Sequence, residues 1–524
     1  MKVVITAAGH SRRFFEAEYA LPKFLLPLSG KPMIQHVIEM FDSSDEFFVL
    51  FNESHQQEFP ELANQVSNMA SKVQVKFIAS HEKGPVETVL AANLNFGEDP
   101  FIVSYCDFFV SWNYQRFLME SADSAASLAV FRGFHPASFG QTLYAYIKTQ
   151  GDSLSFQEIR EKLSFTSERH QEWASAGIYY FSSGHIFEKY AELTKLNLSE
   201  QQGLRELYVT LLFNRMHKDG HNISLFPVDK FICWGTPEDV SQYLKWSEYF
   251  ERPKAPAIRS ISPGINLIPM AGLGERFKKE GFRTPKPLIP IEQQPMFVRA
   301  CNSFPLPRRW IFVMNESLAG NSILQQSLEN FFYNYEVVQL SSPTEGQLMS
   351  CVAAQEKYGD FEPIYVASAD YECIYEEKAW LEQIHSFPDI EVFVWVTQLQ
   401  NQVVQSFKSF GYCRVNEQGQ VLQITEKETI SERPEKDLMM LGSFWFKSGR
   451  YLNQLATLAK QNNCKVNGEY YIGNALNLLI QKGIKVQIFK VDDWISFGNP
   501  LELSIYEYWH DFFAQQKNVA GKVQ

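Results

Sequence analysis

Two stretches of this 524-residue chain share one pattern: "AAGHSRRF" at residues 7–14 and "MAGLGERF" at residues 270–277. Each follows a short apolar run, "KVVIT" before the first and "INLIP" before the second, and each combines small residues with an arginine. A β-rich run that leads into such a turn is typical of a strand followed by a helix. The same strand–turn pattern therefore occurs twice, with Gly9 and Gly272 separated by 263 positions.

The repetition extends along the whole chain at a nearly constant offset. The separation is 263 for the pairs Pro22/Pro285, Lys23/Lys286, Asp107/Asp370, Gly235/Gly498 and Trp246/Trp509, 262 for Gly84/Gly346 and 265 for Glu161/Glu426. Each half is about 250 residues long, well beyond the roughly 20–50 residues of a solenoid unit. The sequence therefore predicts a duplicated domain, at 1–250 and 265–524, joined by a proline-containing linker at 251–264.

Composition and charge limit the classes of function. Hydrophobic residues at 45% and charged residues at 21% are typical of a globular protein, and no apolar run approaches the roughly 18 residues that span a membrane. A net charge of -12 without a basic cluster argues against binding to nucleic acid or an anionic membrane. The seven cysteines are odd in number and never spaced CxxC, which favours reduced thiols in a cytoplasm over disulfides or zinc.

In each half, β-rich runs alternate with helical patterns. The expected strands are 2–6, 46–52, 73–79 and 100–107 in the first half and 265–269, 308–315, 335–341 and 363–370 in the second. Strands separated by helices predict an α/β fold with a mainly parallel sheet that helices cover on both faces. Ligands of such sheets bind beyond the carboxyl ends of the strands, where Gly9, Asp107 and their counterparts fall.

Both turns place small residues where backbone amides could approach a phosphate, and the arginine adds a rigid fork of donors. A tight strand-to-helix turn with a surface arginine would explain either turn alone equally well. Neither turn has the third glycine of a dinucleotide fingerprint, and the P-loop pattern GxxxxGK[ST] is absent. The sequence therefore supports neither NAD binding nor a P-loop.

A proline-flanked lysine follows each turn, Lys23 in "LPKFLLP" (21–27) and Lys286 in "TPKPLIP" (284–290). Proline restricts the backbone, so the cation is rigidly presented in a way that suits a polyphosphate. A lone loop lysine is usually only solvated, but its recurrence beside both turns favours a phosphate site.

An aspartate ends an apolar strand in each half, Asp107 in "IVSYCD" and Asp370 in "YVASAD". A carboxylate at this edge of a sheet could hold Mg²⁺, which keeps several waters and takes few protein ligands. An aspartate that caps the next turn is the alternative. In the second half, Glu372 follows Asp370 by two residues and could be a second oxygen ligand of Mg²⁺.

Together these features resemble the nucleotidyltransferases that make nucleotide sugars and related NDP-alcohols, a family that includes sugar-1-phosphate nucleotidyltransferases and phosphocholine cytidylyltransferases. The resemblance covers nearly the whole of both halves and rests on G-x-[GS]-x-R-[FM] followed by P-K-x-L-x-P. Later stretches also look like the family: "GPVETVLAA" (84–92), "EGQLMSCVAA" (345–354), the E-K pairs at 161–162 and 426–427, "SAGIYYF" (175–181) and "LGSFWF" (441–446). The resemblance implies two tandem Rossmann-like domains of the GT-A type.

The resemblance also implies a reaction and the residues that perform it. A phosphate oxygen of the acceptor would attack the α-phosphorus of an NTP in line and expel pyrophosphate. By position, the catalytic residues that neutralise the triphosphate would be Arg13, Lys23, Arg276 and Lys286. The nucleotide would contact Ala8, Gly9, Ser11, Gly84, Gly272, Gly274 and Gly346. The acceptor would contact Glu161, Lys162, Gly177, Glu426, Lys427, Gly442 and Glu469. The Mg²⁺ ligands would be Asp107 and Asp370.

Two departures separate the chain from the best-known members. These usually place a second metal-binding aspartate two residues before a late Gly-Thr, where this chain has Cys233 and Ser496. Asp229 and Asp492 lie four residues earlier and are the nearby alternatives. The first half reads "LRELYV" where the second reads "NGEYYI", so the acceptor sites are expected to differ, with the second half nearer to the family through Glu469 and its neighbours.

The sequence thus predicts a cytoplasmic, Mg²⁺-dependent enzyme that supplies an activated sugar or alcohol for a surface glycan. A phosphocholine-type cytidylyltransferase is one alternative. Another is that one half binds a nucleotide or NDP-sugar without turnover, as a sensor or scaffold. The expected partners are an NTP and a phosphorylated sugar or alcohol, not nucleic acid or a membrane. The base, the acceptor and a homo-oligomeric state stay open.

Overall fold

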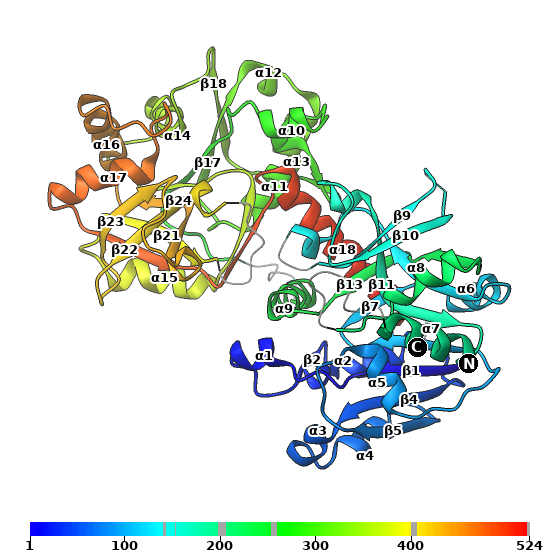
Figure 1. Cartoon of the computed structure of the whole chain (residues 1–524). Helices are drawn as coiled ribbons and strands as arrows, with labels where there is room; N and C mark the ends of the chain where they lie inside the picture. The colour runs from blue at the N-terminus through cyan, green and yellow to red at the C-terminus, as the bar shows by residue number, and fades with distance from the viewer. Residues whose placement is uncertain (140–142, 152, 197–205, 253–258, 400–405, 521–524) are drawn as a thin grey trace. The chain divides into compact units, whose positions relative to one another are not determined.

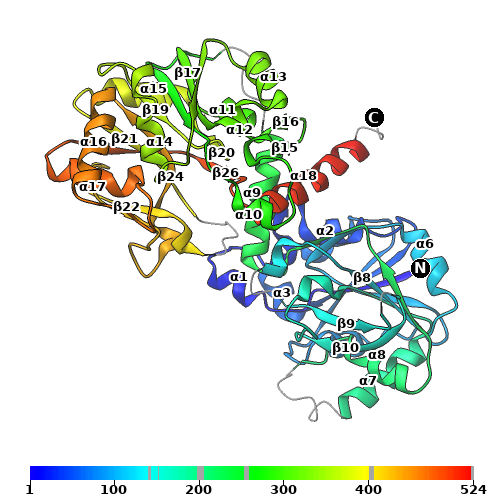
Figure 2. The same cartoon turned by 90° about the horizontal axis from the view of Figure 1, so that it is seen from above.

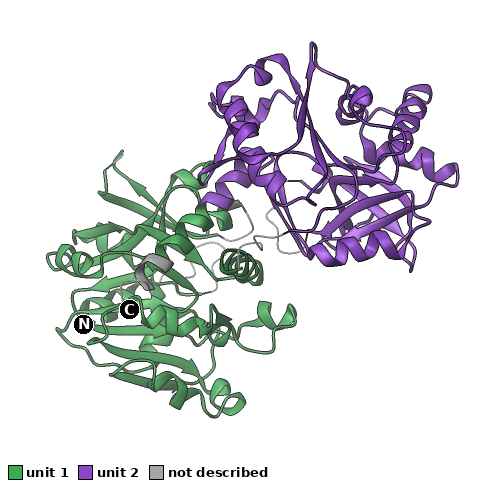
Figure 3. Ribbon diagram, turned by 180° about the vertical axis from the view of Figure 1, so that it is seen from behind, with its two compact units in different colours: residues 1–252, 508–524 green, residues 253–507 purple. Residues whose placement is uncertain are grey.

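The computed structural model describes residues 1–139, 143–151, 153–196, 206–252, 259–399 and 406–520. It contains two compact units, one formed by Met1–Arg252 with Tyr508–Gln524 and the other by Pro253–Glu507 (Figure 3). Each unit is built on a nine-stranded sheet. The predicted α/β class is confirmed.

The sheet of unit 1 has a parallel centre. β1 pairs in parallel with β4 on one side, and β4 pairs with β5 (Figure 1). On its other side β1 pairs in parallel with β6. β11 runs antiparallel to β6 and β8, and β12 lies beyond β8. The strands are β1 (Lys2–Thr6), β2 (Pro27–Leu28), β3 (Lys31–Pro32), β4 (Glu46–Asn52), β5 (Val73–Ile78), β6 (Phe101–Tyr105), β7 (Phe108–Ser111), β8 (Ala126–Phe131), β9 (Ala145–Thr149), β10 (Phe156–Glu161), β11 (Trp173–Phe181), β12 (Ile223–Pro227) and β13 (Lys230–Cys233).

Both faces of this sheet are covered. Side chains alternate across a strand, so Val3 and Ile5 of β1 enter one core cluster and Val4 enters another. Apolar residues of α2 belong to the first cluster and those of α5, α7 and α8 to the second. The helices are α1 (Arg12–Glu16), α2 (Met33–Ile38), α3 (Glu53–Glu58), α4 (Leu62–Ser67), α5 (Pro85–Ala91), α6 (Tyr114–Ser121), α7 (Gly184–Leu196), α8 (Leu211–Lys218) and α9 (Pro237–Glu251).

Unit 2 repeats this topology. Its sheet runs β18-β17-β14-β19-β24-β21-β25, which corresponds strand for strand to β5-β4-β1-β6-β11-β8-β12. The strands are β14 (Ile265–Pro269), β15 (Pro290–Ile291), β16 (Gln294–Pro295), β17 (Arg309–Asn315), β18 (Tyr335–Leu340), β19 (Ile364–Val366), β20 (Tyr371–Ile374), β21 (Val392–Gln398), β22 (Gly411–Val415), β23 (Val421–Glu426), β24 (Leu438–Phe446), β25 (Val486–Lys490) and β26 (Asp493–Ser496).

The helices of unit 2 also repeat those of unit 1. α16 and α17 pack side by side, as α7 and α8 do in unit 1 (Figure 2). The helices are α10 (Glu275–Lys279), α11 (Met296–Asn302), α12 (Glu316–Ala319), α13 (Ser322–Phe331), α14 (Gln347–Val352), α15 (Glu377–Ser386), α16 (Gly449–Gln461), α17 (Ile472–Gln481) and α18 (Pro500–Ala520). None of the described helices is both long and apolar enough to cross a membrane.

The C-terminal end of the chain is divided differently from the predicted 265–524 domain. The part of α18 from Tyr508 onward belongs to unit 1. The Tyr508 hydroxyl donates to the backbone oxygen of Phe231, and the ammonium of Lys230 lies 3.8 Å from the centre of the Tyr508 ring. Aromatic contacts of this kind bury a large area. They depend on tertiary packing, so the composition of the linker does not predict to which unit the end of α18 belongs.

Candidate active site

The glycine-rich turn connects β1 to α1 and, in unit 2, β14 to α10. Ser11 and Gly274 occupy equivalent positions and adopt left-handed backbone, with φ of 52° and 65°. Ser11 Oγ accepts a 3.1 Å hydrogen bond from the backbone nitrogen of Lys23. A Cβ on Gly274 would lie 3.1 Å from the Cβ of Lys286, which favours glycine there. In both units the turn is therefore in direct contact with the lysine segment.

The predicted lysine and aspartate of each unit form an ion pair. Lys23 Nζ lies 2.6 Å from Asp107 Oδ2, and Lys286 Nζ lies 2.5 Å from Asp370 Oδ2. The lysine side chains are 20% exposed in both units, and the aspartates are 23% and 26% exposed. Burial lowers the pKa of Lys23, but the Asp107 carboxylate outweighs it and the pKa is raised overall. The pair places a firmly charged cation at the carboxyl end of the sheet.

The predicted base-side loop has a structural reason for its glycine. A Cβ on Gly84 would lie 2.7 Å from the nitrogen of Leu207, and one on Gly346 would lie 2.8 Å from that of Tyr470. Both glycines have positive φ, 95° and 106°. The close approach is held by hydrogen bonds from Leu207 N to Lys83 O and from Val86 N to Leu207 O, at 2.8 and 3.1 Å. Contact with the base stays a prediction.

We therefore expect Gly84→Ala to lower the free energy of unfolding by about 2–4 kcal/mol, because the methyl group meets backbone in a left-handed conformation. Gly220→Ala is the matched control, since Gly220 has φ 85° but no atom within 4 Å of its Cβ position. Its cost should be about 1 kcal/mol. Urea unfolding followed by circular dichroism compares the two, and equal losses would contradict the close-approach explanation.

Of the residues predicted to bind the acceptor, Glu161 ends β10 and Lys162 follows in left-handed backbone. Thr210 donates to the Glu161 carboxylate, and Lys162 Nζ donates to the Tyr208 hydroxyl. In unit 2 the lysine has the same backbone, with φ 58°, but Lys427 Nζ donates to the backbone oxygen of Ser409. The two E-K pairs thus share a backbone shape and differ in what the lysine binds.

Burial raises the pKa of Glu161, and it raises the pKa of Glu426 to about 7. Because the pKa of Glu426 is raised from 4.5 on folding, the folded state favours the protonated carboxyl. The resulting stabilisation is complete below pH 4.5 and is lost as the pH rises through about 7. At pH 8 the folded state must therefore keep a charged carboxylate in a largely buried position.

We expect Glu426→Gln to raise the free energy of unfolding at pH 8 by about 1–3 kcal/mol and to leave it unchanged at pH 4. The control is Glu428→Gln, which changes an exposed glutamate two residues away. Thermal melts at the two pH values measure the effect. A gain that is equal at pH 4 and pH 8 would show that the carboxyl does not titrate as stated.

In unit 1 the predicted residues surround a single cavity of about 910 Å³. Glu206 and Tyr208, which the sequence analysis did not single out, also line it, and Arg13 Nη2 donates to Gly235 O across 3.2 Å. Ser11, although not part of the lining, holds the backbone of Lys23. The predicted residues in the lining are Ala8, Gly9, Arg13, Lys23, Gly84, Asp107, Glu161, Lys162 and Gly177.

In unit 2 the corresponding cavity is smaller, about 260 Å³, and of the predicted residues only five, all predicted for the nucleotide or the metal, line it. Those residues are Gly272, Gly274, Arg276, Lys286 and Asp370. Gly442 lies close by, because a Cβ on it would be 3.9 Å from Ser368 Oγ, and Ser368 lines the cavity. The predicted residues outside this lining are Gly346, Glu426, Lys427, Gly442 and Glu469.

The stretches "LRELYV" and "NGEYYI", which look different in sequence, are equivalent in the two units. Glu206 and Tyr208 are 263 positions from Glu469 and Tyr471, so "ELY" and "EYY" form one E-x-Y pattern. Tyr471 donates to the Glu469 carboxylate. A systematic comparison at the repeat offset would have identified the pattern.

Three carboxylates offered as further metal ligands lie elsewhere. In the pairing of β13 with β7, Cys233 is opposite Phe108, the residue that follows Asp107. Asp229 lies at the other end of this pairing, where its backbone nitrogen donates to Ser111 O. The pairing of β26 with β20 excludes Asp492 in the same way. Glu372 is buried and forms an ion pair with Arg299 of α11. These interpretations are therefore corrected.

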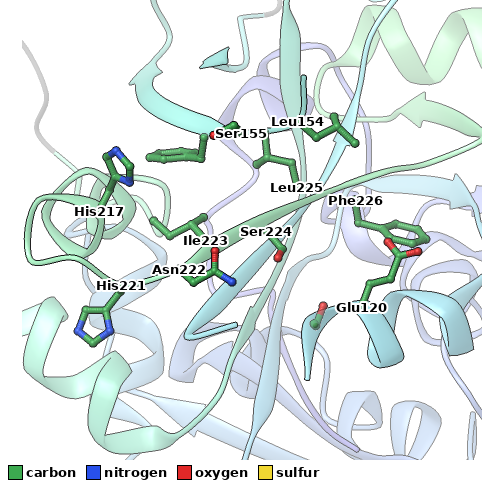
Figure 4. Close-up of a pocket in the computed structure, with 12 residues that line it drawn as sticks. Glu120, Leu154, Ser155, His217, His221, Asn222, Ile223, Ser224, Leu225 and Phe226 are labelled. Carbon is green, nitrogen blue, oxygen red and sulfur yellow. The ribbon is translucent and has the colours of Figure 1, made fainter. Parts of the chain in front are cut away.

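A second cavity of unit 1, about 350 Å³, lies along β12 (Figure 4). His217 and His221 lie on one side of it and Glu120 on the other. The ten predicted residues of unit 1 are all described, and none of them lines this cavity. The cavity at the strand ends is therefore the candidate active site.

Residues 3–169 match the family model of the MobA-like NTP transferase domain. This part of unit 1 is similar to nucleotidyltransferases. The matched residues run from β1 through the glycine-rich turn, the Lys23–Asp107 pair and the Glu161–Lys162 pair. The resemblance inferred from the motifs is thus confirmed.

Curated relatives agree with this similarity. The chain is 23% identical over 290 residues to "Mannose-1-phosphate guanylyltransferase catalytic subunit beta" of Xenopus tropicalis, and the match covers 52% of this chain and 73% of that protein. It is 31% identical over 126 residues to "UTP--glucose-1-phosphate uridylyltransferase" of Bacillus subtilis, which covers 20% of this chain and 42% of that protein. The chain thus spans less than half the length of the Bacillus relative. A solved nucleoside-diphosphate-sugar pyrophosphorylase from Vibrio cholerae RC9 aligns with a TM-score of 0.40 and 20% identity over 47% of this chain and 100% of that one.

Proposed function

We propose that this nucleotidyltransferase joins the nucleotidyl group of an NTP to a sugar 1-phosphate or similar phosphorylated alcohol, in the cytoplasm and for surface-glycan synthesis. The supporting observation is that the cavity of unit 1 brings the phosphate-side residues Arg13 and Lys23 together with the acceptor-side pair Glu161–Lys162. The relatives named above, a mannose-1-phosphate guanylyltransferase and a UTP–glucose-1-phosphate uridylyltransferase, support this class of acceptor.

The proposed reaction needs alignment and charge neutralisation. An oxygen of the acceptor phosphate forms a new bond to the α-phosphorus while the bond to the β-phosphate oxygen breaks, and pyrophosphate leaves with the electron pair. Arg13 and Lys23 would neutralise the triphosphate, and Lys162 would hold the acceptor phosphate. A phosphomonoester is already ionised near neutral pH, so no side chain has to remove a proton.

Magnesium fits the donors that the strand ends offer. Mg²⁺ keeps several waters and binds through one or two carboxylates and the substrate phosphates. Among the described residues no group of three His, Cys, Asp or Glu side chains forms a complete metal site, whereas Asp107 and Asp370 each present a partly exposed carboxylate. When bound with the NTP, the ion would supply positive charge at the triphosphate.

A second candidate applies to unit 2 alone. Its cavity is lined by the nucleotide-side residues and by none of the five predicted acceptor-side or base-side residues, all of which are described. Such a unit could bind a nucleotide without turnover, as a sensor or scaffold.

The test is a pyrophosphate-release screen of the full chain with the four NTPs and dTTP against sugar 1-phosphates and phosphocholine. The single variants Asp107→Asn and Asp370→Asn then show which unit performs each reaction. We expect release with at least one sugar 1-phosphate and its loss in Asp107→Asn. Release with phosphocholine alone would support the cytidylyltransferase alternative. If Asp370→Asn abolishes no reaction, unit 2 is the non-catalytic unit.

A further inference from the structure

The strand next to each metal-side aspartate carries a small residue without a carboxylate. Cys233 of β13 pairs with Phe108, and Ser496 of β26 pairs with Tyr371, so each stands beside the residue that follows Asp107 or Asp370. A second carboxylate therefore cannot come from these strand positions.

In unit 2 a helix supplies one instead. Glu502 is the third residue of α18, and its Oε2 accepts a 2.6 Å hydrogen bond from Ser496 Oγ. The Cβ position of Gly498 lies 3.1 Å from Glu502 Oε2 and 3.5 Å from Asp370 Oδ2. Both carboxylate oxygens are thus within 3.5 Å of one point beside the Gly498 backbone, and Ser496 Oγ lies 3.2 Å from it. Arg276 and Lys286 also act electrostatically on Glu502.

The equivalent residue of unit 1, Asp239, caps a helix instead. Asp239 is the third residue of α9, and its Oδ2 accepts from the nitrogen and hydroxyl of Thr236 at 3.1 and 2.9 Å and from Cys233 Sγ at 3.3 Å. This carboxylate completes the capping box of α9. In unit 2, Asn499 Oδ1 accepts from the nitrogen of Glu502 at 3.0 Å, so the carboxylate of Glu502 is not required for capping.

We propose that Glu502 and Asp370 together bind the divalent cation of unit 2, whereas among the described residues of unit 1 only Asp107 offers a carboxylate at the equivalent place. This inference rests on the proposed function, which places the cation at Asp370. Glutamate is one methylene longer than aspartate, and that length brings the carboxylate of Glu502 to the same side of Gly498 as the Asp370 carboxylate. Two carboxylates should hold a cation before the nucleotide arrives, whereas one carboxylate depends more on the substrate phosphates.

The test measures Mn²⁺ binding to the full chain without nucleotide, from the electron paramagnetic resonance of free Mn²⁺. An Asp107→Asn background removes the carboxylate of unit 1. On this background we expect Glu502→Gln to weaken Mn²⁺ binding by about tenfold or more. Glu275→Gln is the matched control, because Glu275 is an exposed glutamate that lines the same cavity, and it should change the Kd by less than about twofold.

Glutamine can still accept the Ser496 hydroxyl, so the variant should fold, which a melting curve checks. Glu502→Asp is the second variant: it keeps the charge, draws it back by one methylene and should also weaken Mn²⁺ binding. If neither Glu502 variant changes the Kd while Asp370→Asn does, the role of Glu502 is wrong and the metal site stands. If Asp370→Asn also leaves the Kd unchanged, the cation site of the proposed function is wrong as well.

Discussion

Asp107→Asn combined with Asp370→Asn is expected to lower nucleotidyl transfer by about 10³-fold or more, since losing the cation at a triphosphate costs several kcal/mol of transition-state stabilisation. Asparagine keeps the size of each side chain and removes the charge that faces Lys23 and Lys286. The measurement is pyrophosphate release at saturating Mg²⁺, followed by a Mg²⁺ titration of the residual activity.

A matched pair of substitutions controls for the loss of two negative charges. Asp99 and Asp389 are 65% and 82% exposed, and each pairs with a surface lysine. Asp99→Asn combined with Asp389→Asn should leave turnover within about twofold of the unaltered chain. Near-native turnover in the Asp107 and Asp370 variant, or pyrophosphate release that needs no divalent metal, would contradict the metal assignment.

Lys23→Met and Lys286→Met form the second large prediction, with turnover in the altered unit falling by about 10²–10³-fold. Methionine keeps the length of the side chain and removes the cation that would meet the triphosphate. The control is Lys31→Met, because Lys31 is 46% exposed and pairs with Glu39 outside the cavity. Steady-state kinetics in full-chain variants, with the other unit silenced by its aspartate substitution, separates the two units.

The same variants are also expected to change stability. From the sequence alone, removing a solvated loop lysine would be expected to lower the free energy of unfolding by less than about 0.5 kcal/mol. Because each lysine is only 20% exposed and neutralises a partly buried aspartate, we expect a loss of about 1–2 kcal/mol instead. Unfolding curves of Lys23→Met and Lys31→Met measure this difference. A loss of turnover that merely follows a collapse of folding would make the lysines structural.

The parts of the fold that depend on local pattern could be predicted. The repeat offset and the apolar runs predicted two copies of one α/β domain. The four strands expected in each half lie within a few residues of the expected ranges, as β1, β4, β5 and β6 in unit 1 and as β14, β17, β18 and β19 in unit 2. The antiparallel β11 and β24 were not distinguished, because an apolar run does not state its direction.

The residues that belong to a sequence motif were predicted to lie together. The contacts that depend on tertiary packing were not predicted. In unit 1 the glycine-rich turn, Lys23 and Asp107 converge as expected on one cavity. That Lys23 is bonded to Asp107 depends on how η1 (Lys23–Leu25) packs beside β6, which no spacing reveals. Glu502 was missed because its place beside Asp370 depends on where α18 begins relative to β26.

The most direct measurement of the central claim is the mass of the product. The full chain is incubated with Mg²⁺, each NTP and a panel of sugar 1-phosphates, and the products are separated and identified by mass spectrometry. We predict a nucleoside diphosphate sugar formed in step with pyrophosphate, and its absence in the Asp107→Asn/Asp370→Asn variant. Pyrophosphate without such a product, or no product from any pairing of NTP and phosphorylated acceptor, would contradict the account.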